Sequence, residues 1–120
     1  RLTKELKAEM YSFGPLIPHP ATPLANSPRP SLETALNAIA RARIMDPEAK
    51  IVATTALETL DPENGARRGL LAGANSLMVN VTPEKYRCRY EIYPDRAFTE
   101  VKQVVDLLYS LGRAPTDLGL

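Results

Sequence analysis

Six of the eleven prolines of this chain crowd into one stretch, from Pro15 to Pro30. Each proline ring removes a backbone donor and clashes with a preceding helical turn, so the stretch is neither helix nor central strand throughout. The apolar residues just before it predict a short strand over 11–17 that runs into a rigid loop over 18–30. Such a loop displays its carbonyls at low entropic cost, which suits recognition of a planar ligand such as a nucleobase. A loop that only returns the chain to its next helix is the alternative.

After this loop the chain alternates between helical and strand-like patterns. Ser31 is typical of a helix N-cap, and the apolar residues after it repeat at helical spacing. In chain order the patterns predict a helix from Ser31 that stops at Asp46-Pro47, and then a buried strand over 51–56. A short helix ended by Gly73 and a strand over 76–80 follow. The last two elements are a helix starting at Thr82-Pro83-Glu84 and a helix whose apolar stripe runs from Val101 to Leu111 and is closed by Gly112.

Strands that alternate with helices over short connections predict an α/β protein with a parallel sheet and right-handed crossovers. Three strands with helices on one side shield neither both faces nor both edges of a sheet. A complete eightfold barrel needs about 250 residues. We therefore expect this chain to be the closing portion of a parallel β/α, TIM-type barrel. It is a single partial domain in this interpretation, with the last three β/α units over 1–94 and a closing helix and tail over 95–120.

The charge balance and the cysteine count exclude several classes of protein. Fifteen Lys and Arg stand against fourteen Asp and Glu, so no excess of cations is available for a nucleic-acid partner. No run of about 18 apolar residues predicts a membrane span, and the first residues have no apolar core of a signal peptide. The single cysteine, Cys88, which we place in a helix, can form no internal disulfide and cannot alone hold a metal centre. A reducing cytoplasm is the expected compartment.

Chemistry-bearing side chains follow all three predicted strands, at the ends where β/α barrels carry their active sites. The hydroxyls of Thr54 and Thr55 can donate hydrogen bonds to a carboxylate or another anion. Met78, Tyr90 and Tyr93 can line a cavity, with the thioether for contact and the phenols for polar orientation. The alternative is structural, because Thr is a common strand former and aromatic residues at helical spacing are usually packing contacts.

Four stretches, taken together, resemble a known family in their order and spacing. They are GPLIPHPATPL over 14–24, ATTAL over 53–57, AGANSLMVNVTP over 72–83, and the segment from Tyr86-Arg87 to Tyr90-Glu91-Ile92-Tyr93-Pro94. The chain is similar, from about Phe13 to Gly112, to the C-terminal half of the HydE-type radical S-adenosylmethionine maturases of iron-only (FeFe) hydrogenase. Biotin synthase and methylornithine synthase share part of the pattern, and the Pro-His-Pro and Ala-Thr-Thr-Ala elements favour the maturases.

The resemblance implies that the chain corresponds to about strands six to eight of a full barrel plus its closing helices. It also implies chemistry in which a [4Fe-4S] cluster reductively cleaves S-adenosylmethionine to a 5′-deoxyadenosyl radical. In the maturases that radical acts on a small-molecule substrate during assembly of the hydrogenase diiron site. The implied partners are the N-terminal half of the barrel, which would carry the cluster ligands, and other hydrogenase maturases.

The resemblance also assigns roles to residues by position. Pro15 and Ile17 match strand-end residues that contact the nucleoside part of the cofactor. Thr54 and Thr55 match the pair that holds a substrate carboxylate or anion. Three further residues match positions that line the same cavity, namely Met78, Tyr90 and Tyr93. No catalytic side chain is assigned within this chain.

Because of three departures from the family pattern, the resemblance does not fix the identity of the substrate. No C-x-x-x-C-x-x-C occurs in the chain, so it cannot bind the cluster alone. Glu58 stands where the pattern has glycine, which adds a charge near the expected site, and Val79 replaces an expected proline. A biotin synthase- or methylornithine synthase-like enzyme, or a catalytically inactive barrel used as a binding scaffold, are the alternatives.

Overall fold

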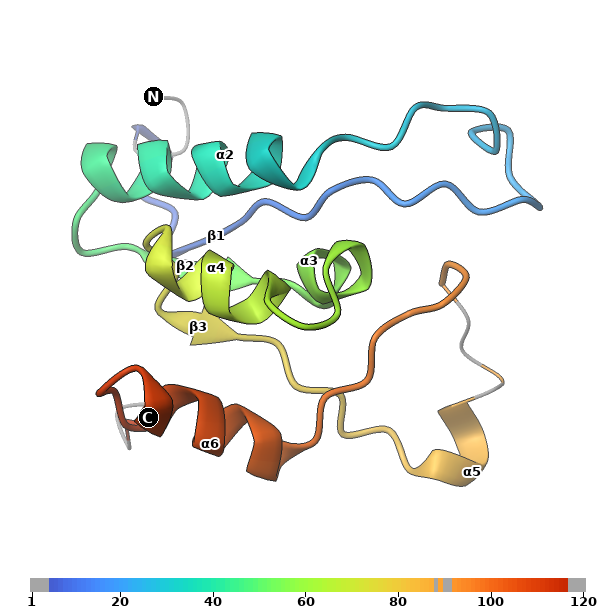
Figure 1. Cartoon of the computed structure of the whole chain (residues 1–120). Coiled ribbons are helices and arrows are strands. Elements are labelled where there is room, and N and C mark those ends of the chain that lie inside the picture. Colours follow the sequence, from blue (N-terminus) through green and yellow to red (C-terminus); the bar gives the residue numbers. More distant parts are fainter. Residues whose placement is uncertain (1–4, 88, 90–91, 117–120) are drawn as a thin grey trace.

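A small parallel sheet organises the chain in the computed structural model, which describes residues 5–87, 89 and 92–116 (Figure 1). Its strands, β1 (Met10–Ser12), β2 (Lys50–Ala53) and β3 (Ser76–Leu77), lie in the order β1-β2-β3. Both pairings are parallel, with Tyr11 opposite Ile51 and Val52 opposite Ser76. The predicted α/β class with a parallel sheet is therefore confirmed for the described part of the chain.

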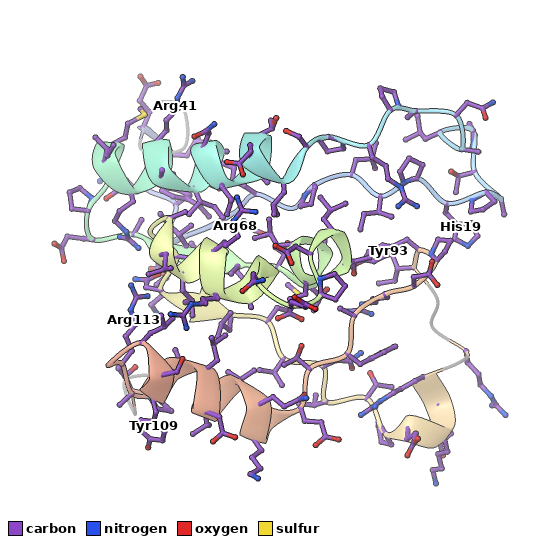
Figure 2. All side chains as sticks on the ribbon, viewed as in Figure 1. His19, Arg41, Arg68, Tyr93, Tyr109 and Arg113 are labelled. Carbon is purple, nitrogen blue, oxygen red and sulfur yellow. The ribbon has the colours of Figure 1, made fainter. Side chains whose placement is uncertain are left out.

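Helices connect and follow the strands. They are α2 (Leu32–Met45), α3 (Thr55–Leu60), α4 (Gly65–Leu71), α5 (Glu84–Arg87) and α6 (Val101–Ser110). On the outer surface Arg68 of α4 forms an ion pair with Glu33 of α2 (Figure 2). None of the helices in the described ranges has the length and apolarity that crossing a bilayer requires.

One hydrophobic core joins the sheet to the helices on one of its faces. Its fully buried side chains are Ile39 of α2, Ile51 of β2, Leu57 of α3 and Leu70 of α4. Partly buried leucines of α6 pack against the same cluster. Because successive strand residues point to opposite faces, Tyr11 of β1 enters this core while its neighbours on the strand are exposed.

The predicted helix boundaries that depend on local chemistry are confirmed. The Ser31 hydroxyl accepts a hydrogen bond from the N–H of Thr34 at 3.2 Å and so caps α2. Gly73 and Gly112 follow α4 and α6 with φ of 122° and 67°, conformations that favour glycine. At the end of α6 the N–H groups of Gly112 and Arg113 bond back to the last helical turn, as in a Schellman motif.

The predicted strands were too long, and α3 was missed. The strands expected over 11–17, 51–56 and 76–80 end at residues 12, 53 and 77. β2 ends because α3 begins directly after it, with the N–H of Leu57 bonded to the Thr54 carbonyl at 3.0 Å. Once the central strand turns away, the residues after β1 and β3 have no ladder partner there. Pro15 could not donate to a ladder in any case.

The helix expected from Thr82-Pro83-Glu84 is short. It spans Glu84–Arg87 and carries Tyr86. Tyr90, expected one turn later on the same face, and Cys88, expected in that helix, lie outside the described residues.

The outer strands of the sheet lead to a prediction about the isolated chain. Within the described residues β1 and β3 each pair on one side only, and unpaired strand edges are templates for association. We expect residues 1–120, expressed alone, to self-associate at micromolar concentration. Sedimentation velocity checks this, and a monomer that melts cooperatively would contradict it.

Candidate functional site

The carboxyl ends of the three strands meet at one edge of the sheet, which we call the strand-end edge (Figure 1). The segment over 13–30, which we call the proline loop, leaves β1 there, Thr54 follows β2, and Met78 follows β3. The N–H of Met78 bonds to the carbonyl of Ala53 at 3.3 Å, which holds the last two segments together. In open or closed parallel α/β sheets ligands bind at this edge.

The start of the proline loop alternates between buried and exposed residues. Pro15 and Ile17 are buried, while Leu16 between them is exposed. Farther along, Nδ1 of His19 accepts a hydrogen bond from the N–H of Ala21 at 3.0 Å, so this ring stabilises the turn at the loop tip (Figure 2). The loop is thus fixed by its own local bonds, with Pro15 and Ile17 turned inward.

Thr54 carries a buried hydroxyl without a partner. The residue is 7% exposed, and its Oγ1 makes no hydrogen bond in the described part of the chain. The side chain does not cap α3 either. It lies against the proline loop, since a Cβ added at Gly14 would come 3.4 Å from Oγ1. A buried hydroxyl that forms no hydrogen bond costs about 1–3 kcal/mol, so a ligand acceptor at this point would recover that free energy.

Thr55 and Tyr93, both predicted as site residues, contact each other. Thr55 Oγ1 and Tyr93 Oη lie 3.2 Å apart and share a hydrogen bond, and Thr55 is buried. Figure 2 shows Tyr93 beside α3, although the two residues are far apart in sequence. Met78 is 43% exposed and, within the described residues, is not hydrogen-bonded to this pair. Tyr90 lies outside the described residues, so its predicted role stays a prediction.

α3 makes two further bonds to the segment around Tyr93. Thr59 Oγ1 accepts from the N–H of Ala97 at 3.0 Å, and Glu58 Oε2 accepts from Thr99 Oγ1 at 2.6 Å. These positions were not among the predicted site residues. The spacing of 55, 58 and 59 is that of one helical face, but the signal was hidden because residues 54–56, where the helix begins, were predicted as strand.

The burial of the Glu58 carboxyl leads us to expect that the free energy of unfolding depends on pH. Burial raises the pKa of this carboxyl above the ordinary 4.5, and the hydrogen bond from Thr99 opposes part of this rise. The protonated Glu58 carboxyl therefore contributes in full to the free energy of unfolding below about pH 4.5. This contribution is lost as the pH rises through the raised pKa of the folded protein. We expect Glu58→Gln to remove that loss. Urea unfolding of the full-length wild type and the full-length Glu58→Gln variant, at pH values from below 4.5 upwards, measures this loss. Parallel curves of the free energy of unfolding against pH would contradict the prediction.

A cavity of about 800 Å³ lies away from the strand-end edge, beside β3 and α6. Arg43 and Arg113 line it, but both guanidinium groups are bound to main-chain carbonyls: Arg43 Nε to Gly73 at 2.9 Å and Arg113 Nη1 to Ala74 at 3.2 Å. Gly73 and Ala74 follow α4, and Arg113 Nη2 also donates to the carbonyl of Leu70 in the last turn of the helix at 3.3 Å. The two arginines therefore fix the chain at the end of α4, where cations are favourable.

No group of three or more His, Cys, Asp or Glu side chains that could hold a metal ion occurs in the ranges the structure describes. The sequence contains one cysteine. The residues of this chain therefore do not fit an iron–sulfur cluster, which needs three or four thiolate ligands.

Comparison with known proteins extends the motif resemblance over nearly the whole chain. The family model described as "Biotin and Thiamin Synthesis associated domain" matches residues 12–113. The chain is 39% identical over 118 residues to the [FeFe] hydrogenase maturase subunit HydE of Thermotoga maritima. That alignment covers 93% of this chain and 34% of the maturase, so the chain spans about a third of the length of this curated relative. The resemblance to HydE-type proteins is confirmed.

Proposed function

Because this chain belongs to the family of Biotin and Thiamin Synthesis associated domains, we propose that it is the C-terminal portion of a radical S-adenosylmethionine enzyme of the hydrogenase-maturase type. In this proposal residues 1–94 are the last three β/α units, about strands six to eight, of a TIM-type barrel. Residues 95–120 are its closing helix and tail. The parallel register of the three strands and the helices on one face support it.

The cofactors divide between this chain and the part of the protein upstream of it. When bound, S-adenosylmethionine and a [4Fe-4S] cluster supply a 5′-deoxyadenosyl radical. The cluster ligands belong to the upstream part, since Cys88 is the one thiol of this chain. Pro15 and Ile17 are buried at the strand-end edge, where they would pack against the nucleoside and exclude water from it.

The buried Thr54 hydroxyl is the observation that carries the proposed substrate site. It has no hydrogen-bond partner among the residues that the structure describes, and it lies at the edge where parallel sheets bind ligands. A substrate carboxylate would accept its hydrogen bond. Thr55, Tyr93 and Met78 would line the same space, with the hydroxyl pair orienting the substrate. Tyr90 is assigned to this set by the resemblance alone.

Assembly of a hydrogenase diiron site is the process in which we place the full-length protein. Its partners would then be the N-terminal half of its own barrel, a small-molecule substrate and other hydrogenase maturases. We place it in the cytoplasm, where reducing conditions preserve an iron–sulfur cluster.

Cleavage of S-adenosylmethionine by the full-length protein tests the proposal. After reconstitution with iron and sulfide and reduction, we expect 5′-deoxyadenosine to form, measured by liquid chromatography. An upstream sequence without C-x-x-x-C-x-x-C would contradict the enzymatic proposal. Cluster loading without cleavage would instead support the inactive barrel used as a scaffold.

A further inference from the structure

Three side chains on one face of α3 hold the segment over 93–99 by hydrogen bonds. Thr55 bonds to Tyr93, Thr59 to the N–H of Ala97, and Glu58 to Thr99. Tyr93 is thus held at one end of the segment, next to the strand-end edge. Glu58 holds the other end, directly before α6, where Glu100 is the N-cap.

We propose that Glu58 is a positioning residue, which holds the phenol of Tyr93 at the strand-end edge by anchoring Thr99. The inference rests on the proposed function of that edge. It names a residue outside the set assigned to the substrate. It also gives a physical role to the acid that departs from the glycine of the family pattern.

The Glu58–Thr99 contact suits an anchor better than the other two bonds do. Glu58 is 6% exposed, so water competes little for its carboxylate. The separation between Thr99 Oγ1 and Glu58 Oε2 is short, at 2.6 Å, and a hydrogen bond to an ionised carboxylate is about twice as strong as a neutral one. The bond between the hydroxyls of Thr55 and Tyr93 is longer, at 3.2 Å. Without the anchor, the phenol would be held only by that weaker bond and by the bond of Thr59 to the N–H of Ala97, which fixes the backbone and not the side chain of Tyr93.

Two other charged side chains line the cavity beside Glu58. Glu63 and Arg67 line the same cavity of about 390 Å³, together with Gln103 of α6. Arg67 Nη1 donates to Ser110 Oγ at 3.3 Å. The side chain that fixes the Glu58 carboxylate is therefore Thr99.

Fluorine NMR of the full-length protein labelled with 3-fluorotyrosine tests the proposal directly. Tyr93→Phe identifies the Tyr93 signal by its loss. We expect Glu58→Ala and Thr99→Val each to shift or broaden that signal, and Glu58→Gln, whose amide oxygen still accepts from Thr99, to restore it. Glu63→Gln is the matched control, because it removes an acid from the same cavity without touching Thr99. If Glu58→Ala does not fold, Thr99→Val carries the test.

The outcomes separate this inference from the proposed function. An unmoved Tyr93 signal in both Glu58→Ala and Thr99→Val would overturn the positioning role, even if the wild type cleaves S-adenosylmethionine. Absence of cleavage in the wild type would overturn the proposed function while leaving the fluorine result intact. In an active protein we expect Glu58→Ala to lower cleavage on the order of tenfold, and to have no further effect in a Tyr93→Phe background. Equal losses in both backgrounds would instead indicate a merely structural role.

Discussion

Gly65→Ala is expected to lower the free energy of unfolding of the full-length protein by about 3 kcal/mol, the upper end of the usual cost of overpacking. Gly65 is the first residue of α4, and it packs against α3. A Cβ at this position would lie 2.3 Å from the carbonyl oxygen of Leu57 and 2.6 Å from its carbon. Those atoms are backbone and cannot rotate away, so the two helices must separate. Urea unfolding measures the loss.

Gly112→Ala is the matched control for this substitution. Gly112 has a φ of 67° and no atom within 4 Å of an added Cβ, so alanine there meets only the conformational penalty of about 1–2 kcal/mol. An equal or smaller loss for Gly65→Ala would contradict the steric explanation. Because α3 carries Thr55 and begins directly after Thr54, we also expect Gly65→Ala, and not Gly112→Ala, to lower S-adenosylmethionine-dependent activity.

Thr54→Val is expected to weaken binding of a carboxylate ligand by about tenfold to a hundredfold, the equivalent of one hydrogen bond to a charged group. The same change should leave the free energy of unfolding unchanged or slightly higher. Valine has the shape of threonine, and it removes a buried hydroxyl that has no partner in the described chain. Calorimetric titration of the full-length protein with L-cysteine, used as a carboxylate-bearing probe, measures the binding.

Two controls define that result. Cysteamine lacks the carboxylate of L-cysteine, so its binding should not respond to Thr54→Val. Thr55→Val removes a hydroxyl that is bonded to Tyr93, and it should lower the free energy of unfolding by about 1 kcal/mol. Unchanged affinity for L-cysteine in Thr54→Val would count against the proposed anion site.

Much of the fold could be predicted because it depends on neighbours in sequence. The cap at Ser31 and the endings at Gly73 and Gly112 are properties of a few consecutive residues. The alternation of strands and helices, and with it the parallel sheet, follows from hydrophobic periodicity. The candidate site was partly predictable for a related reason: parallel strands place their carboxyl ends at one edge, so Thr54 and Met78 belong there by topology.

The lengths of the strands could not be predicted locally. Residues 54–56 are β-branched or small and fit a strand, yet a helix begins there and packs against α4. Tertiary packing overrode propensity at this point. Since a strand residue needs a partner on the neighbouring strand, the early end of β2 also shortened β1 and β3.

The sequence by itself determined the caps, the sheet class, the family and the element types other than α3, because each is encoded in short windows or in motif order. Only the tertiary structure decided that Thr55 contacts Tyr93, that Glu58 accepts a hydrogen bond from Thr99, and that the Thr54 hydroxyl is buried with no partner in the described ranges. The physical reason is distance along the chain. A hydrogen bond across some forty residues exists only where packing brings its two ends together, and no local pattern carries that information.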